Sequence, residues 1–433
     1  MIPVHTTLFL GGAAASLTLL LAGPPQGAPA GAAPPATGQG TKQQGPASGT
    51  AGEKKPAEKK APRPAGYWYG VEKAPAKQKG AVRVAAYNVE NLFDDKDDPS
   101  LSGEYDDVKM ITKPTRVQAI ADMIRKLDAD VLCIEEVESL EALTWFRDTY
   151  LKDMGYDHAY SEDVGYYRGV EQACLSRFPI KAHATFVAED LSDMDGKREG
   201  EGWAKKKPDQ GQKFQRSPLK LEIDVNGYPL TVYSVHLKAG GKEFEYQRES
   251  ESLQIVQFVK DELAKNPEAN VVVMGDFNAT PTQKAAKAFT EGGMRSAYDF
   301  RGTKSGNTKD LYTTHDSGRA IDFIFMSPGL AADAVDRGFF VLSTMHPEST
   351  YRWQDDPEKE KVPAGYASDH CPVAIDVMPK DDKPASAGKA PAKGGKSAKP
   401  ADADDDETPA KSSGGSGGGS KAKPASPPAR GED

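Results

Sequence analysis

Short runs of β-branched and apolar residues, each bounded by turn residues, constrain the fold of this chain most strongly. Such runs are typical of β-strands. They cover residues 81–87, 130–134, 172–176, 219–225, 230–235, 270–274, 320–325 and 372–377. Residues 115–127 carry apolar side chains at helical spacing behind Pro114, and 140–154 and 244–264 are the other long helix candidates.

The order of these segments predicts an α/β protein with mixed sheets. Strands alternate with helices along much of the chain, which favours parallel pairing. The runs 219–225 and 230–235, however, flank Asn226-Gly227, which is a strong signal for an antiparallel hairpin. Residues 196–215 are polar and aperiodic and are expected to form a long loop.

The two ends of the chain differ in composition from its centre. Residues 31–80 and 380–433 are dominated by Ala, Pro, Gly, Lys, Ser and Asp. Such segments bury too little apolar surface to offset the entropy of ordering, so we expect both to be disordered. Residues 81–379 then form one folded domain.

The first thirty residues resemble a secretory signal. The apolar run from Leu8 to Ala22 is shorter than a membrane span requires, and Ala28-Pro29-Ala30 offers a cleavage pattern. An uncleaved membrane anchor is the alternative. We therefore expect a secreted, periplasmic or cell-envelope protein with no stable membrane insertion after cleavage.

Cysteine usage and net charge exclude some classes of function. Cys133, Cys174 and Cys371 each lie in or beside an apolar run, which is typical of free buried thiols, although one disulfide stays open. The formal net charge of −9 argues against a basic protein that coats nucleic acid. It is compatible with a metal enzyme, because carboxylates bind cations.

Polar residues follow nearly every strand-like run at its end. Each of them alone is an ordinary turn or helix-start residue. Ligand sites of α/β proteins lie at strand ends, so their joint occurrence predicts one shared site. The set comprises Asn88, Glu135, Glu136, His236, Asp276, Asn278, Asp322, Asp369 and His370.

The residue types in this set support a narrow range of chemistry. Carboxylate and amide oxygens without a cysteine ligand set favour a hard cation such as Mg²⁺, Mn²⁺ or Ca²⁺. Two histidines beside carboxylates suit proton transfer near neutral pH. Together they fit attack of water on phosphorus. Residues 81–379 contain no G-x-S-x-G, Walker or G-x-G-x-x-G pattern.

Seven sequence blocks, in a fixed order along the chain, resemble those of a known protein superfamily. They are AAYNVENLFD, LCIEEVE, CLSRFPI, VYSVHLKAGG, VVMGDFNATP, AIDFIF and ASDHCPVAI. Together they resemble the endonuclease/exonuclease/phosphatase superfamily, which includes DNase I, AP endonucleases, sphingomyelinases and inositol polyphosphate 5-phosphatases. The match extends over residues 81–377. The resemblance implies a four-layer α/β sandwich of two central mixed sheets flanked by helices, with the site at one open edge.

The resemblance also implies roles for individual residues. Asn88, Glu136 and Asp369 match metal-site positions, although Glu135 stands where many members have Gln. Asp276 and Asn278 match the pair that positions the nucleophile and the phosphate. Asp322 and His370 match a dyad in which the carboxylate orients the imidazole.

His236 indicates which members of the superfamily the chain resembles most. It matches the second histidine of DNase I-like and sphingomyelinase-like members, so the chain is expected to be closer to DNase I-like extracellular nucleases than to exonuclease III-type AP endonucleases. Glu171 falls where DNase I-like members carry the carboxylate paired with this histidine. Candidate phosphate contacts, each of which could instead be a structural cation, are Arg168, Arg177, Arg216, Lys238 and Arg248.

These inferences favour an exported, metal-dependent phosphodiesterase that hydrolyses DNA or RNA, with Mg²⁺ (or Mn²⁺ or Ca²⁺) as cofactor and a monomeric state. The alternative is an enzyme that acts on lipid head groups or small phosphorylated molecules with the same chemistry. Tyr166-Tyr167-Arg168 could stack a base at the rim of the site or be a packed strand end. A non-catalytic surface protein is disfavoured, because all the residues of the expected site are present.

Overall fold

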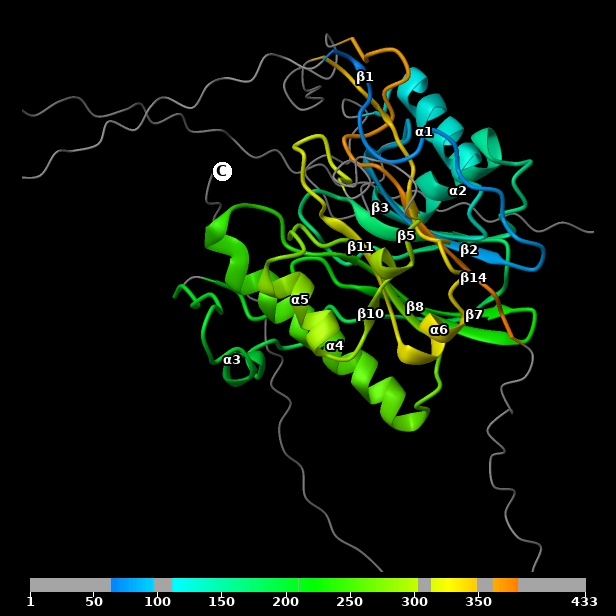
Figure 1. The fold of residues 1–433 in the computed structure, drawn as a ribbon. Helices are drawn as coiled ribbons and strands as arrows, with labels where there is room; N and C mark the ends of the chain where they lie inside the picture. The colour runs from blue at the N-terminus through cyan, green and yellow to red at the C-terminus, as the bar shows by residue number, and fades with distance from the viewer. Residues whose placement is uncertain (1–63, 97–110, 209, 303–312, 349–360, 381–433) are drawn as a thin grey trace, which may run out of the picture. The chain divides into compact units, whose positions relative to one another are not determined.

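Two six-stranded β-sheets lie face to face in the computed structural model, which describes residues 64–96, 111–208, 210–302, 313–348 and 361–380 (Figure 1). The first sheet has the strand order β12 (Phe340–Val341), β14 (Val373–Val377), β2 (Val82–Leu92), β3 (Val131–Val137), β5 (Glu171–Ser176) and β4 (His158–Ser161). The second has the order β10 (Arg295–Ser296), β11 (Asp322–Met326), β9 (Val271–Asp276), β8 (Tyr228–His236), β7 (Leu219–Val225) and β6 (Ile180–Thr185). The pairs β2–β3 and β8–β9 are parallel and the other pairs are antiparallel, so the predicted mixed sheets are confirmed.

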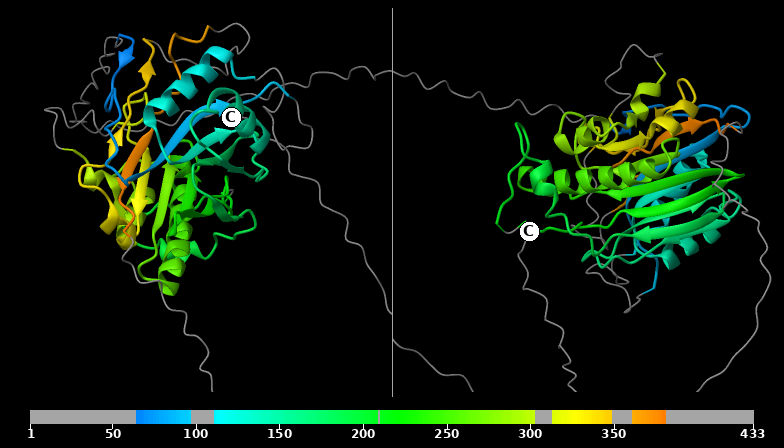
Figure 2. Two further views of the ribbon diagram at one scale, coloured as in Figure 1. Left: turned by 90° about the vertical axis from the view of Figure 1, so that its right-hand side faces the viewer. Right: turned by 90° about the horizontal axis from the view of Figure 1, so that it is seen from below.

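Helices cover the outer face of each sheet (Figures 1 and 2). Helices α1 (Pro114–Leu127) and α2 (Leu140–Tyr150) pack on the first sheet, and α4 (Glu245–Lys265) and α5 (Lys284–Glu291) pack on the second. Alternation along β2 shows why: Val84 and Ala86 join the core between the sheets, whereas Ala85 and Tyr87 join the core beneath α1. The four-layer α/β sandwich is confirmed.

Each predicted strand and long helix is present, with bounds shifted by a few residues. The strands β4 and β6 were not predicted, because each is short and interrupted by polar residues such as His158 and Lys181. Shorter elements complete the described chain: α3 (Met194–Lys197), α6 (Pro328–Asp333), η1 (Lys242–Phe244) and η2 (Ala297–Phe300). Residues 196–215 form the expected loop apart from the end of α3.

The predicted disordered linker is wrong for residues 64–80. Strand β1 (Gly66–Tyr67) pairs with β13 (Met345–His346), and the Trp68 ring stacks on His346 with centroids 4.8 Å apart. Further along, Lys77 Nζ lies 2.8 Å from Asp130 Oδ1. The aromatic residues of this segment supply the burial that the Ala/Pro-rich composition lacks. The rest of the predicted linker, the signal segment and the tail after residue 380 lie outside the described residues.

The cysteines behave as predicted for free thiols. Cys133, Cys174 and Cys371 are buried and form no disulfide, and Cys133 and Cys174 lie opposite each other on β3 and β5. Within the described ranges, no helix is long and apolar enough to cross a membrane. The apolar run from Leu8 to Ala22 is outside those ranges.

Candidate functional site

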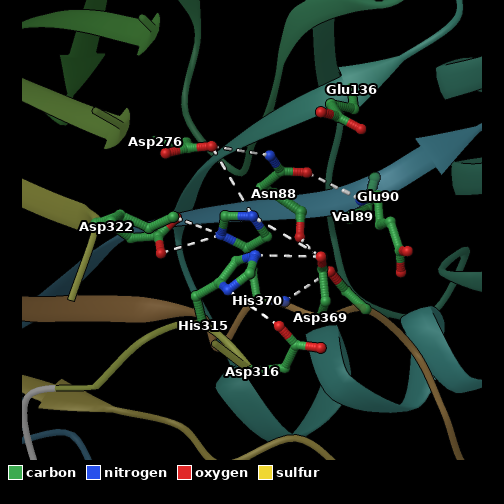
Figure 3. Close-up of polar contacts among 12 residues, drawn as sticks. Asn88, Val89, Glu90, Glu136, Asp276, His315, Asp316, Asp322, Asp369 and His370 are labelled. Carbon is green, nitrogen blue, oxygen red and sulfur yellow. Dashed lines mark hydrogen bonds and ion pairs between the residues drawn. The ribbon is translucent and has the colours of Figure 1, made fainter. Parts of the chain in front are cut away.

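The candidate site lies where the ends of strands from both sheets meet. In the parallel pair β8–β9, His236 lies opposite Asp276 at the ends of both strands, and in the parallel pair β2–β3, Asn88 lies opposite Glu135. Strand β11 starts at this edge, because Asp322 pairs with Asp276. Asn88 lies in β2 and Glu136 in β3, and Figure 3 shows both turned towards the side chains of Asp276 and its neighbours. The predicted strand-end residues are therefore brought together.

Asp322 and His370 form the expected dyad. His370 Nδ1 lies 3.0 Å from both carboxylate oxygens of Asp322, and both residues are buried. Burial alone would lower the pKa of His370, but the carboxylates of Asp322, Asp369 and Asp276 together raise it well above its ordinary value. The imidazole is therefore held in one orientation and in its charged form at neutral pH.

Asp276 is the centre of the hydrogen-bond network. Its Oδ2 accepts from Asn88 Nδ2 at 3.3 Å and from Asn278 Nδ2 at 3.1 Å, and its Oδ1 accepts from the Asn278 backbone N–H at 2.8 Å. Burial raises its pKa to about 6, with His370 lowering and Asp322 raising it. Asp276 is thus a carboxylate at neutral pH that is basic enough to accept a proton.

His236 is the uncharged counterpart of His370. Its Nε2 lies 3.4 Å from Asp276 Oδ2 and 3.8 Å from Glu136 Oε1. Burial, followed by the charges of Arg216, Arg168 and His370, lowers the pKa of His236 well below its ordinary value. Arg216 fixes the chain at this point, because its guanidinium donates to the carbonyls of His236 at 3.1 Å and Leu237 at 2.8 Å.

The backbone is held in rare conformations around the site. Glu136 has φ of 67° and Asn278 of 47°, in the left-handed region that non-glycine residues seldom adopt. Three residues before Asn278, Gly275 has φ of 140°, and a Cβ there would collide with the Val235 carbonyl oxygen. These conformations aim side chains at the site at a cost in local stability, which is typical of functional positions.

The acidic groups near Asn88 fit a divalent cation. Glu90, buried near the end of β2, has its pKa raised to about 8, chiefly by burial and then by the neighbouring charge of Asp369. Glu136 adds a further negative charge there, and its Oε2 lies 3.5 Å from Arg168 Nη2. Such crowding of oxygen anions is what a hard cation would offset. Asn88, Glu136 and Asp369 remain the residues that would hold it.

His315 was missed by the sequence analysis. Its Nε2 lies 3.2 Å from Asp369 Oδ2, and its Nδ1 lies 3.1 Å from Asp316 Oδ1. Among the His, Cys, Asp and Glu side chains of the described ranges, His315, Asp369 and His370 form a group whose ligand atoms all lie within 4.8 Å of one another. The available signal was the Thr-His-Asp triplet that precedes the strand containing Asp322.

Arg177 is not at the site, so its predicted phosphate contact is wrong. Its guanidinium lies 2.6 Å from Asp130 and 2.8 Å from Asp128, and it donates to the Met154 carbonyl at 2.8 Å. Asp130 precedes the start of β3, whereas Glu136 lies near the end of that strand. Arg177 therefore ties together the opposite end of the sheet.

Glu171 does not form the predicted pair with His236. The acidic partners of His236 in the described structure are Asp276 and Glu136. Glu171 is buried at the start of β5, where burial and then the charge of Asp163 raise its pKa to about 9. A neutral carboxyl group is therefore expected at this position at neutral pH.

The other candidate phosphate contacts differ in their surroundings. Lys238 Nζ lies 3.9 Å from the centroid of the Phe244 ring, beside a cavity of about 530 Å³ lined also by residues 210–215 and Gln247. Arg248 donates to the Lys238 carbonyl at 3.0 Å and so supports this loop. Arg168 faces Glu136 at the site itself.

A sequence model of the endonuclease/exonuclease/phosphatase family matches residues 85–370. No curated protein sequence matches the chain.

Several solved structures resemble this one. Truncated TDP2 from Caenorhabditis elegans is 18% identical with TM-score 0.43, over 70% of this chain and 98% of that one. The human nocturnin catalytic domain with bound sulfate is 18% identical with TM-score 0.44, over 70% and 95%. A mannosyl-6-phosphatase from Bacteroides thetaiotaomicron is 21% identical with TM-score 0.41, over 68% and 98%. On the family match, the chain belongs to the endonuclease/exonuclease/phosphatase family, whose members are metal-dependent phosphoric ester hydrolases.

Proposed function

We propose that the protein is an exported, Mg²⁺-dependent phosphodiesterase that hydrolyses DNA or RNA, closer in its chemistry to DNase I-like enzymes than to exonuclease III-type enzymes. Asn88, Glu136 and Asp369 would hold the cation. When bound, the cation offsets the negative charge that grows on the phosphoryl oxygens. Mn²⁺ or Ca²⁺ could occupy the same oxygen ligands.

Side chains of the site divide the proton transfers between them. Asp276 accepts a proton from the attacking water, and Asn278 holds the Asp276 carboxylate in place. The water oxygen bonds to phosphorus as the bond to the leaving oxygen breaks. His370, charged and oriented by Asp322, donates a proton to that leaving oxygen. Neutral His236 donates a hydrogen bond to the phosphoryl group.

The position of Tyr167 is the observation that supports nucleic acid as the substrate. This side chain is 56% exposed, and it precedes Arg168, which reaches Glu136 in the site. Its neighbour Tyr166 is buried and packs with Phe93 and Tyr366, so the segment is anchored. An exposed ring beside a cation at the site offers base stacking next to a phosphate contact.

Lipid head groups are the alternative substrates, and the apolar surface disfavours them. Large hydrophobic side chains that are more than a third exposed, among the described residues, come from four separate segments. They are Tyr67, Ile111, Tyr167 and Val187. A lipid-binding rim would require them to be grouped on one loop.

Purified protein assayed on plasmid DNA, RNA, sphingomyelin and bis-p-nitrophenyl phosphate tests the proposal. We expect hydrolysis of nucleic acid that EDTA abolishes and Mg²⁺ restores. Loss of a stacking ring costs ~1–3 kcal/mol, so Tyr167→Ala should raise KM for DNA about 5- to 150-fold. The rate on bis-p-nitrophenyl phosphate, which has no base, should stay unchanged.

Tyr67→Ala is the matched control, because Tyr67 is 47% exposed but lies in β1 with its ring near Lys126. Equal effects of the two substitutions would remove the argument for stacking. Activity on sphingomyelin alone would establish the lipid alternative, and activity that survives EDTA would rule out the metal mechanism.

Export and the monomeric state are separate proposals. Export is supported by the apolar run from Leu8 to Ala22 and by the Ala28-Pro29-Ala30 cleavage pattern. The monomeric state is supported by the fact that one chain supplies the whole described site. Mass spectrometry of protein recovered outside the cytoplasm should find a mature N-terminus near residue 31. An intact Met1 would support the uncleaved anchor instead.

A further inference from the structure

Two aspartate–histidine pairs converge on Asp369 from different segments of the chain (Figure 3). In the first, Asp322 contacts His370 Nδ1, and His370 Nε2 lies 3.8 Å from Asp369 Oδ1. In the second, Asp316 contacts His315 Nδ1 at 3.1 Å, and His315 Nε2 lies 3.2 Å from Asp369 Oδ2. Each imidazole thus has a carboxylate behind it and presents its other nitrogen to the same carboxyl group.

The backbone holds the two pairs together. His315 and His370 form an antiparallel bridge, and the Asp316 backbone N–H donates to the Asp369 carbonyl at 2.9 Å. On the other side, the Cys371 N–H donates to the Thr314 carbonyl at 2.6 Å. The rings of His315 and His370 meet edge to face with centroids 4.6 Å apart. The convergence is therefore built by main-chain pairing and does not depend on flexible side chains alone.

We propose that His315 Nε2, His370 Nε2 and the Asp369 carboxylate form a second divalent-cation site, which shares only Asp369 with the oxygen site of Asn88, Glu136 and Asp369. Two imidazoles and one carboxylate suit Zn²⁺ or Co²⁺ better than Mg²⁺. Histidines that bind metals usually donate their other ring N–H to a carboxylate, which is the place of Asp316 and Asp322 here. The site shares His370 with the phosphodiesterase chemistry proposed above, and an ion on His370 Nε2 would take the place of the proton that His370 donates there.

A simple ion pair is the competing explanation of the same geometry. In that case a proton on His315 Nε2 occupies the place of the ion, and Nδ1 can accept the Ser317 backbone N–H at 3.0 Å. Metal binding requires a neutral imidazole whose Nδ1 proton faces Asp316 or the Ser317 hydroxyl, which lies 2.8 Å away. The two explanations differ in one respect: only in the metal site do His315 and Asp316 determine the affinity for a nitrogen-ligated cation.

Titration of the chelator-stripped full-length protein with Co²⁺ and Zn²⁺ separates the two explanations. Visible absorption of Co²⁺ reports nitrogen ligation, and calorimetry counts the Zn²⁺ ions bound. We expect a nitrogen-ligated ion in the wild type and in Glu136→Gln. His315→Gln should lose it, and Asp316→Ala should bind it ~10- to 100-fold more weakly, because it removes an outer carboxylate partner.

His183→Gln is the matched control, because His183 is a half-exposed imidazole near a carboxylate, with its Nδ1 4.0 Å from Glu162. It should bind Co²⁺ as the wild type does. An unchanged Co²⁺ spectrum and affinity in His315→Gln would overturn the proposal. Asp316→Ala keeps the imidazole, so it decides the question if His315→Gln fails to fold. None of these readouts depends on hydrolysis, so loss of the proposed nuclease activity would leave them unaffected.

Discussion

Replacing Glu171 by glutamine tests whether this residue is a partner of His236 or a neutral structural group. Glu171 is buried at the start of β5, opposite Val137 of β3. Glutamine has nearly the same shape and cannot ionise. If Glu171 oriented His236, the substitution would disturb catalysis. The structure predicts that it changes stability instead.

The expected size follows from the pKa of Glu171. The carboxyl group titrates near 4.5 in the unfolded chain, and burial raises its pKa to about 9 in the folded protein. Between these values the folded state holds one proton more than the unfolded state. The free energy of unfolding therefore falls as pH rises, by about 1.4 kcal/mol per unit from this group. From pH 6 to 8, Glu171→Gln should gain about 2.7 kcal/mol relative to the wild type.

Urea unfolding of both proteins at pH 6, 7 and 8 measures this difference. All other groups titrate alike in the two proteins, so the change in the gap isolates Glu171. We expect the gap to widen steadily in favour of the variant, while kcat stays within a few-fold of the wild type. A constant gap would show that Glu171 is ionised in the folded protein. A loss of kcat of about 10²-fold would restore its role beside His236.

Three further predictions concern the site and its surroundings. His370→Ala and His236→Ala should each lower kcat on bis-p-nitrophenyl phosphate by about 10² or more, and wild-type rates would contradict their roles. Asp322→Asn removes the carboxylate 3.0 Å from His370 Nδ1 and should lower kcat by ~10²–10⁴. Because Asp322 raises the pKa of His370, activity that needs the charged imidazole is lost as pH rises through that pKa. In Asp322→Asn this alkaline limb should move to lower pH, and an unmoved limb in the pH–rate profile would refute the acid role. Arg177→Ala should leave kcat unchanged but lower the free energy of unfolding by about 1–2 kcal/mol in urea, because Asp130 loses one of its cations. A selective loss of activity would return Arg177 to the site.

Much of the fold and the centre of the site could be predicted from local patterns. The residues before His236 and before Asp276 are recognisable as strands, because a buried strand needs a short run of apolar residues that is visible in the local sequence. Asn226-Gly227 identifies the hairpin, because few other residue pairs adopt its turn. The short strand β4 and the segment 64–80 escaped prediction, because their burial comes from distant partners such as His346.

The sequence by itself determined which residue types stand at the strand ends, and therefore the kind of chemistry. Strand termination is a local property, so His236 and Asp276 could be placed at strand ends without knowledge of the fold. The tertiary structure decided which charged groups meet. Sheet register turns Arg177 towards Asp130 and leaves Glu171 buried in its protonated form, and the bridge between two remote loops brings His315 to Asp369. These contacts join residues far apart in the chain, and no local pattern records them, because they depend on how the sheets and loops close around the site.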